Sequence, residues 1–115
     1  MVLLAIDIRE QVDTVVLKLK GILNGETAHI FENTLHNYTD KGIYKLIVDF
    51  EHLEFLSSSG VGCFIGNIKM IRDKGGDIRF VAVHPKIRRV FQILEFDGFF
   101  HSFESLDEAL ASFQG

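Results

Sequence analysis

The sequence has a single cysteine, Cys63, a single proline, Pro85, and no tryptophan among its 115 residues. One cysteine cannot form an internal disulfide, which fits a reducing compartment. No apolar run approaches the roughly 20 residues that a membrane-spanning helix needs. Residues 1–7 also lack the basic start of a signal peptide. We therefore expect a cytoplasmic, soluble protein without a membrane partner.

Acidic residues outnumber basic ones: the chain has 12 lysines and arginines and 16 aspartates and glutamates, so its formal net charge is −4. Nucleic-acid-binding surfaces are usually strongly basic, so we expect no nucleic-acid partner. The chain is 47% hydrophobic and 24% charged, which is typical of a globular domain with a real core. Its length predicts one domain over residues 1–115, and no repeat, linker or low-complexity segment interrupts it.

The spacing of apolar residues predicts nine elements in the order β-β-α-β-α-β-α-β-α. The predicted strands cover residues 2–8, 14–20, 45–50, 78–83 and 99–103. The predicted helices begin near Asn24, Val61, Pro85 and Leu106. The first two strands form a hairpin, and the later alternation of strands and helices implies parallel strands with crossover helices. The predicted fold is therefore a single α/β domain with a mixed sheet and an antiparallel edge.

Glycines and small polar residues mark the predicted element boundaries. Gly21 ends the second strand, and Asn24 or Thr27 caps the first helix. Ser105 and Glu108 have the spacing of a capping box, which predicts the start of the last helix.

The most informative segment is Ser57-Ser58-Ser59-Gly60, which links a predicted strand to a predicted helix. Backbone N–H groups are unpaired at a helix start and favour a negative group. A serine there can act as a cap, a nucleophile or a phosphorylation site. A cap needs only one hydroxyl, and Gly60 and Gly62 each weaken the first turn by ~1 kcal/mol relative to alanine. Glycines let another backbone approach closely, so the segment favours contact with a partner or a phosphate.

Two enzyme motifs fail at this segment. A hydrolase elbow Gly-x-Ser-x-Gly centred on Ser58 has Leu56 at its first glycine position. A dinucleotide pattern Gly-x-Gly-x-x-Gly that begins at Gly60 has Ile65 at its third glycine. No Walker motif occurs. We therefore expect a protein that is not an enzyme, with no catalytic residues and no cofactor of its own. A hydrolase that pairs Ser58 with His84 or His101 is the third alternative, because the composition permits a triad.

The five histidines show no metal-ligand spacing, so we expect no metal site. His52 lies between Glu51 and Glu54 in a segment that we interpret as a solvated charged loop. His84, before Pro85, is interpreted as a residue at a helix start rather than a ligand.

Two further features have simple interpretations. Cys63 lies in the first turns of the predicted helix, where the helix dipole can make a thiol reactive. We favour the interpretation that it is a small buried apolar side chain. Lys86, Arg88 and Arg89 form a small basic cluster, either a solvated helix face or a contact for an acidic partner.

A phosphate on Ser58 would add about −1.5 to −2 charges at the helix start. The free amides and the helix dipole there tolerate that charge. A partner docked over the turn would instead meet a new charge and a desolvation cost, so the modification can switch binding while the fold stays intact.

The chain resembles the STAS domains, and specifically the bacterial anti-sigma factor antagonists. The family pattern of an aspartate, two serines and Gly-Leu/Val-Gly after an apolar strand is matched by Asp49 and by Leu56-Ser-Ser-Ser-Gly-Val-Gly62. The family's upstream Gly-Glu-Leu-Asp-x-x-Thr-Ala corresponds to residues 21–28, and its last two helices to residues 84–94 and 103–110. The resemblance covers essentially the whole chain and implies a single STAS-type domain.

The resemblance also implies a mechanism. In this family the unphosphorylated antagonist binds an anti-sigma factor that is also a serine kinase of the histidine-kinase-like ATPase type, and binding releases the sigma factor. The kinase phosphorylates the antagonist and disables it, and a serine phosphatase resets it. The matching acceptor is Ser58, with Ser59 and Ser57 as alternative acceptors. ATP and magnesium would belong to the partner.

The partner-binding residues implied by the match are Asn24, Thr27, Ser57, Ser58, Ser59, Gly60, Val61 and Gly62. Asn24 and Ser57 stand where the family usually has aspartate, so two negative charges near Ser58 are absent while hydrogen-bonding ability remains. The alternative function is a non-switching STAS scaffold, a subunit of a larger regulatory or lipid-transport complex, in which the serines only cap the helix. We expect a monomer or a weak homodimer.

Overall fold

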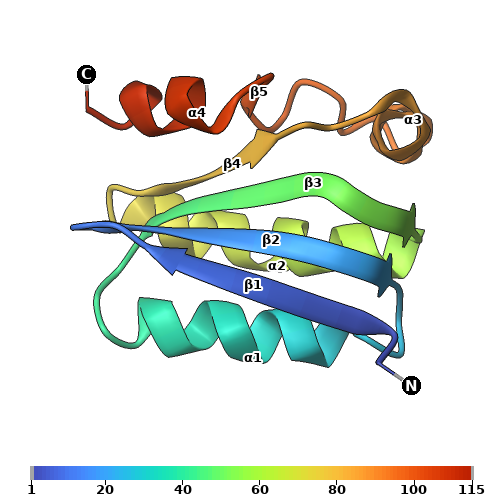
Figure 1. Cartoon of the computed structure of the whole chain (residues 1–115), viewed down its shortest axis with the longest axis horizontal. Helices are drawn as coiled ribbons and strands as arrows, with labels where there is room; N and C mark the ends of the chain where they lie inside the picture. The colour runs from blue at the N-terminus through green and yellow to red at the C-terminus, as the bar shows by residue number, and fades with distance from the viewer. Residues whose placement is uncertain (1, 115) are drawn as a thin grey trace.

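The computed structural model describes residues 2–114, and its elements follow the predicted order (Figure 1). The strands are β1 (Leu4–Glu10), β2 (Thr14–Leu23), β3 (Lys45–Leu56), β4 (Asp77–Val81) and β5 (Ser102–Phe103). The helices are α1 (Ala28–Thr39), α2 (Ser58–Asp73), α3 (Pro85–Ile93) and α4 (Leu106–Ser112). The strands form one sheet in the order β1-β2-β3-β4-β5.

The sheet is mixed, as predicted. β1 pairs with β2 in an antiparallel hairpin, and every other neighbouring pair is parallel. Since each parallel strand pairs with the next one in sequence, the carboxyl ends of β2 to β5 lie along one edge of the sheet. The connections that leave this edge are the segments in which the predicted functional residues lie.

The two faces of the sheet are covered differently. α1, α2 and α3 pack on one face, where Phe31, Phe64 and Phe91 join the main core. α4 packs on the opposite face, where Ala109 contacts a second cluster with Val16 and Ile47. Alternate side chains of the central strands reach the two cores, which explains why their sequences are almost continuously apolar.

Six of the 11 phenylalanines are buried in the main core. The rings of Phe50, Phe64, Phe80, Phe91 and Phe100 contact one another, mostly edge to face. The centroids of Phe50 and Phe80 are 4.8 Å apart with an interplanar angle of 81°, a preferred geometry for aromatic pairs. Among residues 2–114, none of the helices is both long enough and apolar enough to span a bilayer.

The prediction that Gly21 ends the second strand is wrong. β2 continues to Leu23, and Gly21 stays within it at φ +102°. A Cβ at this position would lie 2.2 Å from the carbonyl oxygen of Leu3, so glycine is required because β1 passes directly against it.

The third strand is six residues longer than predicted, because it continues from Phe50 to Leu56. The interpretation of His52 and its acidic neighbours as a loop is therefore wrong. These side chains are exposed on β3, where His52 Nε2 lies 3.0 Å from Glu51 Oε1. Two register shifts in the pairing of β2 with β3 break the period-two pattern here, and this irregularity hid the strand.

Candidate functional site

The serine turn, defined as residues 57–60, joins β3 to α2 and lies beside the connection between β2 and α1. The backbone N–H of Ser57 donates to the carbonyl oxygen of Leu23 at 3.0 Å. A Cβ added to Gly60 would lie 2.5 Å from the same oxygen, and one added to Gly25 would lie 3.6 Å from Ser59 Cβ. The two connections are thus in direct backbone contact, and glycine at 60 permits it.

The three serine hydroxyls are not equivalent. Ser57 is the N-cap of α2, and its Oγ accepts the N–H of Gly60 at 3.1 Å. Ser58 is the first residue of α2, and both Ser58 and Ser59 are exposed. Within residues 2–114, neither of their hydroxyls takes part in a hydrogen bond. One serine therefore does the capping, and two hydroxyls stay accessible to another molecule.

Asn24 and Thr27 hold the neighbouring connection in shape. Asn24 Oδ1 accepts the N–H groups of Glu26 at 2.9 Å and Thr27 at 3.1 Å. Thr27 Oγ1 donates to the carbonyl of Ile22 at 2.8 Å and accepts the N–H of Asn24 at 3.0 Å. Thr27 is the N-cap residue of α1, but its side chain makes no capping bond. The two side chains therefore brace the loop and do not cap the helix.

Three of the eight predicted partner-binding residues lie beneath the surface. Thr27 is 2% exposed and Val61 1% exposed, and Gly60 is also buried. These residues shape the turn and present no side chain to another molecule. Ser58, Ser59 and Gly62 are exposed, and Asn24 and Ser57 are half-buried. The accessible part of the site is therefore the start of α2 with the rim of the adjacent loop.

The exposed face of α2 carries a line of residues that sequence reasoning did not identify in full. Ser58, Gly62, Gly66 and Met70 follow one another at intervals of four, and all four are exposed. We call this line the α2 stripe. A Cβ on Gly62 or Gly66 would meet nothing within 4 Å outside the helix itself. Packing within the chain therefore does not require these glycines, although each costs about 1 kcal/mol of helix stability.

The first turns of the two helices at this site carry no acidic side chain. Asn24 and Ser57 are neutral, so the unpaired N–H groups and the dipole at the start of α2 favour a negative group there. A phosphate on Ser58 would therefore be tolerated by the fold.

Cys63 is a buried apolar side chain, as we favoured, and the reactive interpretation is wrong. Its side chain is 3% exposed, and Sγ lies 3.8 Å from the carbonyl oxygen of Ala28. Burial, with a smaller contribution from the nearby Glu32 carboxylate, raises the pKa of the thiol from 9.0 to about 11. The thiol therefore stays protonated at neutral pH and is a poor nucleophile.

The remaining predicted features have structural roles. His84 is the N-cap residue of α3, and its Nε2 lies 3.1 Å from the carbonyl oxygen of Leu53, which ties α3 to β3. Ser105 Oγ accepts the N–H of Glu108 at 3.2 Å, so the predicted N-cap of α4 is confirmed. The residues of the described range 2–114 contain no group of three or more metal-binding side chains.

The mixed five-stranded sheet, with the serine turn between β3 and α2, is the arrangement of an α/β domain of the STAS type. The chain belongs to the STAS domain family, because the family's model matches residues 5–109. BtrV of Bordetella bronchiseptica is 29% identical over 96 residues, which cover 84% of this chain and 83% of BtrV. The anti-sigma F factor antagonist of Paenibacillus polymyxa is 29% identical over 83 residues, which cover 68% of each chain.

Solved structures share the fold. The unphosphorylated form of the anti-sigma factor antagonist SpoIIAA has a TM-score of 0.83 at 24% identity, with 96% of this chain and 97% of that chain covered. The phosphorylated form of SpoIIAA from Bacillus has a TM-score of 0.73 at 24% identity, with 94% and 98% covered. These likenesses confirm the predicted architecture.

Proposed function

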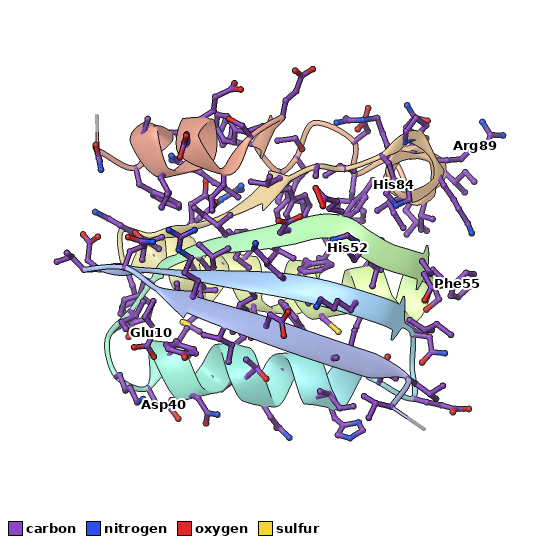
Figure 2. All side chains as sticks on the ribbon, in the orientation of Figure 1. Glu10, Asp40, His52, Phe55, His84 and Arg89 are labelled. Carbon is purple, nitrogen blue, oxygen red and sulfur yellow. The ribbon has the colours of Figure 1, made fainter. Side chains whose placement is uncertain are left out.

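We propose that this protein is an anti-sigma factor antagonist that binds its anti-sigma factor through the serine turn and the α2 stripe. The α2 stripe is the observation that carries the proposal. Packing within the chain does not require the exposed glycines at 62 and 66, but they allow another backbone to lie close against α2. Phe55, just before the turn, is 46% exposed and adds apolar surface at the end of β3 (Figure 2).

The named relatives support this role. The Paenibacillus protein is an antagonist of an anti-sigma F factor, and the Staphylococcus aureus relative, 26% identical over 77 residues, is an antagonist of an anti-sigma-B factor. Binding is the activity that such proteins share, and the motifs of an enzyme are absent from the serine turn. The protein is therefore a regulatory binding module and not a catalyst.

Phosphorylation of Ser58 is the proposed switch. Its hydroxyl is exposed and lies at the first position of α2, whereas the Ser57 hydroxyl is engaged in the cap. Ser59 is also exposed and lies next to Gly25, which makes it the alternative acceptor. A phosphate on Ser58 would stand at one end of the α2 stripe and place a double charge within the docked surface. The kinase would be the bound anti-sigma factor itself, and a separate serine phosphatase would reset the switch.

A non-switching STAS scaffold is the second candidate, because Ser57 alone satisfies the cap of α2. In that case the Ser58 hydroxyl has no function. The scaffold function does not account for the exposed glycines of the α2 stripe, so we favour the switch.

The test incubates the protein with candidate histidine-kinase-like serine kinases from the same genome and ATP, followed by mass spectrometry of residues 57–59. We expect phosphate on Ser58 and none on the Ser58→Ala variant. Calorimetry should then show that Ser58→Glu loses kinase binding. Gln92→Glu is the matched control, since it adds the same charge at an exposed position of α3. Unchanged binding by Ser58→Glu, or no phosphate on any of the three serines, would reject the switch.

A further inference from the structure

The outer edge of β1 presents backbone hydrogen-bonding groups that point away from the sheet. β1 stands at one end of the strand order, and within residues 2–114 it pairs with β2 alone (Figure 1). The N–H of Ile22 donates to the carbonyl oxygen of Leu3, and the N–H of Gln11 donates to that of Thr14. Because hydrogen-bonded pairs alternate along an antiparallel ladder, the odd-numbered residues of β1 bond to β2. The N–H and carbonyl groups of its even-numbered residues therefore face outward, where they can pair with another strand.

Exposed apolar side chains gather along the same strand. Among residues 2–114, eight large hydrophobic side chains are exposed, and four of them lie on β1 or within two residues of its ends. These four are Val2, Leu3, Ile8 and Val12, and Ile8 is 47% exposed. Single exposed apolar residues are normal, but a row of them beside an unpaired strand edge indicates a contact surface.

The charged side chains of β1 indicate which strand fits this edge. Asp7 and Arg9 are both exposed, and they lie on the face of β1 opposite to Leu4 and Ile6, which pack on the main core. A second β1 in antiparallel pairing centred on Ile8 would place Asp7 opposite Arg9 of the second copy, and Arg9 opposite its Asp7. These are non-hydrogen-bonded positions, where facing Cα atoms are only about 4.5 Å apart and opposite charges stabilise the pair.

The neighbouring registers are unfavourable. Pairing centred on Asp7 would place two aspartates opposite each other, and pairing centred on Arg9 would place two arginines opposite each other. The register centred on Ile8 also brings Ile8 opposite its own copy and Val12 to the level of Leu4 in the other chain, so apolar side chains meet there as well. The charges of β1 therefore favour one self-pairing and oppose its closest alternatives, as edge strands use charge to limit pairing.

We propose that β1 is a dimerisation edge, at which two copies of this chain pair antiparallel about a two-fold axis at Ile8. The contact is isologous and closed, so it ends at two copies and does not propagate. It is only one strand wide and therefore small, which makes it a transient contact that depends on protein concentration. None of the residues of the serine turn lies on β1, so the inference does not rest on the proposed function.

Amide hydrogen exchange of the full chain, followed by NMR, tests the pairing directly. In dilute solution the N–H groups of the even-numbered residues of β1 should exchange quickly, and those of the odd-numbered residues slowly. At millimolar concentration the even-numbered N–H groups should exchange about threefold or more slowly than before, because mass action then favours the paired state. Sedimentation equilibrium over the same concentrations should show the average mass rising toward that of a dimer.

Charge variants test the register. Arg9→Glu makes Asp7 face a negative charge and should weaken dimerisation about tenfold or more. Asp7→Lys should weaken it similarly through two facing positive charges, and it costs the fold little, because the ion pair of Asp7 with Lys20 is exposed.

An equimolar mixture of these two variants brings opposite charges together again at both positions and should dimerise as strongly as the parent. Arg89→Glu is the matched control. It reverses the same charge on α3, where Arg89 projects away from the sheet in Figure 2, and should leave dimerisation unchanged. The spectrum of each variant in dilute solution identifies any that fails to fold.

Three results would overturn the proposal. The first is a monomer mass at every concentration, together with unchanged exchange along β1. The second is protection that appears on another element and leaves the even-numbered residues of β1 unprotected, which would place the contact elsewhere. The third is a mixture of the two charge variants that associates no better than each variant alone, which would show that Asp7 and Arg9 do not meet.

Discussion

The carbonyl oxygen of Leu23 accepts the N–H of Ser57 at 3.0 Å, and it would lie 2.5 Å from a Cβ at Gly60. The end of β2 thus holds the backbone of the serine turn at Ser57 and Gly60. Ser58 and Ser59 are exposed, while the half-buried Ser57 and the buried Gly60 are held by the cap and by the contact with β2. This combination suits a surface that a partner recognises and a kinase modifies.

This contact predicts opposite effects for two neighbouring glycines. Gly60→Ala would place its methyl group against Leu23 and Leu56, so overpacking should lower the free energy of unfolding by about 1–3 kcal/mol. Gly62→Ala meets open space and should raise it by up to about 1 kcal/mol through helix propensity. Urea unfolding of both variants measures the difference. Equal stabilities would contradict the close approach of Leu23.

The α2 stripe predicts that Gly66 matters for binding and not for the fold. Gly66→Gln should keep or slightly raise stability, because the position is exposed and glutamine is a better helix former. The same variant should weaken binding of the anti-sigma factor at least tenfold, since its side chain holds the partner backbone away from α2. Asn37→Gln, at an exposed position of α1, is the control for a surface glutamine. Full binding by Gly66→Gln would remove the α2 stripe from the interface.

Ser57 should be replaceable by the family's aspartate without loss of stability. The Ser57→Ala variant loses the bond to the Gly60 N–H and should be destabilised by about 1 kcal/mol. Ser57→Asp keeps the cap and adds a charge that the helix dipole favours, so its stability should equal or exceed that of the parent. Thermal unfolding at low and high salt separates the two contributions, since the dipole term weakens in salt. A Ser57→Asp variant as unstable as Ser57→Ala would contradict the capping geometry.

Ser58→Asp should stabilise the fold while it abolishes partner binding. The first turn of α2 has no acidic residue, so an added carboxylate should contribute about 0.3–1 kcal/mol at low ionic strength. Urea unfolding of the variant and calorimetry with the partner measure the two effects separately. Loss of binding together with loss of the fold would show that the charge acts through unfolding and not at the interface.

The order of the elements and the location of the serine turn were predictable from the sequence, because helical and strand periodicities are local, as are the capping signals of the three serines and of Ser105. Which of the three serines caps α2 was not predicted, and the helix begins at Ser58, three residues before the expected Val61. The full length of β3 was not predictable, since the bulges opposite Lys20 and Ile22 depend on pairing with β2. The burial of Thr27 and Val61 also depends on how two connections pack, which no local pattern encodes.

The α2 stripe also depends on how the elements pack, which local sequence patterns do not encode. In the sequence, Gly62 already suggests close approach of another backbone, whereas Gly66 appears only as a glycine that weakens a helix. Their meaning depends on which face of α2 is left open by the sheet and by α1.

Cys63 predicts a pH dependence of stability in the alkaline range. Burial raises the pKa of its thiol to about 11 in the folded chain, from 9.0 when it is exposed. Above pH 9 the unfolded chain therefore releases this proton more readily than the folded chain does. The contribution of Cys63 to stability is fully present below pH 9 and is lost as the pH rises toward 11.

The Cys63→Ala variant isolates this effect, because it has no thiol to titrate. Its stability should fall less between pH 9 and pH 11 than that of the parent, although it is lower at neutral pH owing to the lost sulfur contacts. Urea unfolding across this pH range gives both slopes. Thiol labelling at pH 8 should also be slow in the folded parent and become fast only on addition of urea. Rapid labelling of the folded chain would show that Cys63 is accessible and that its pKa is not raised.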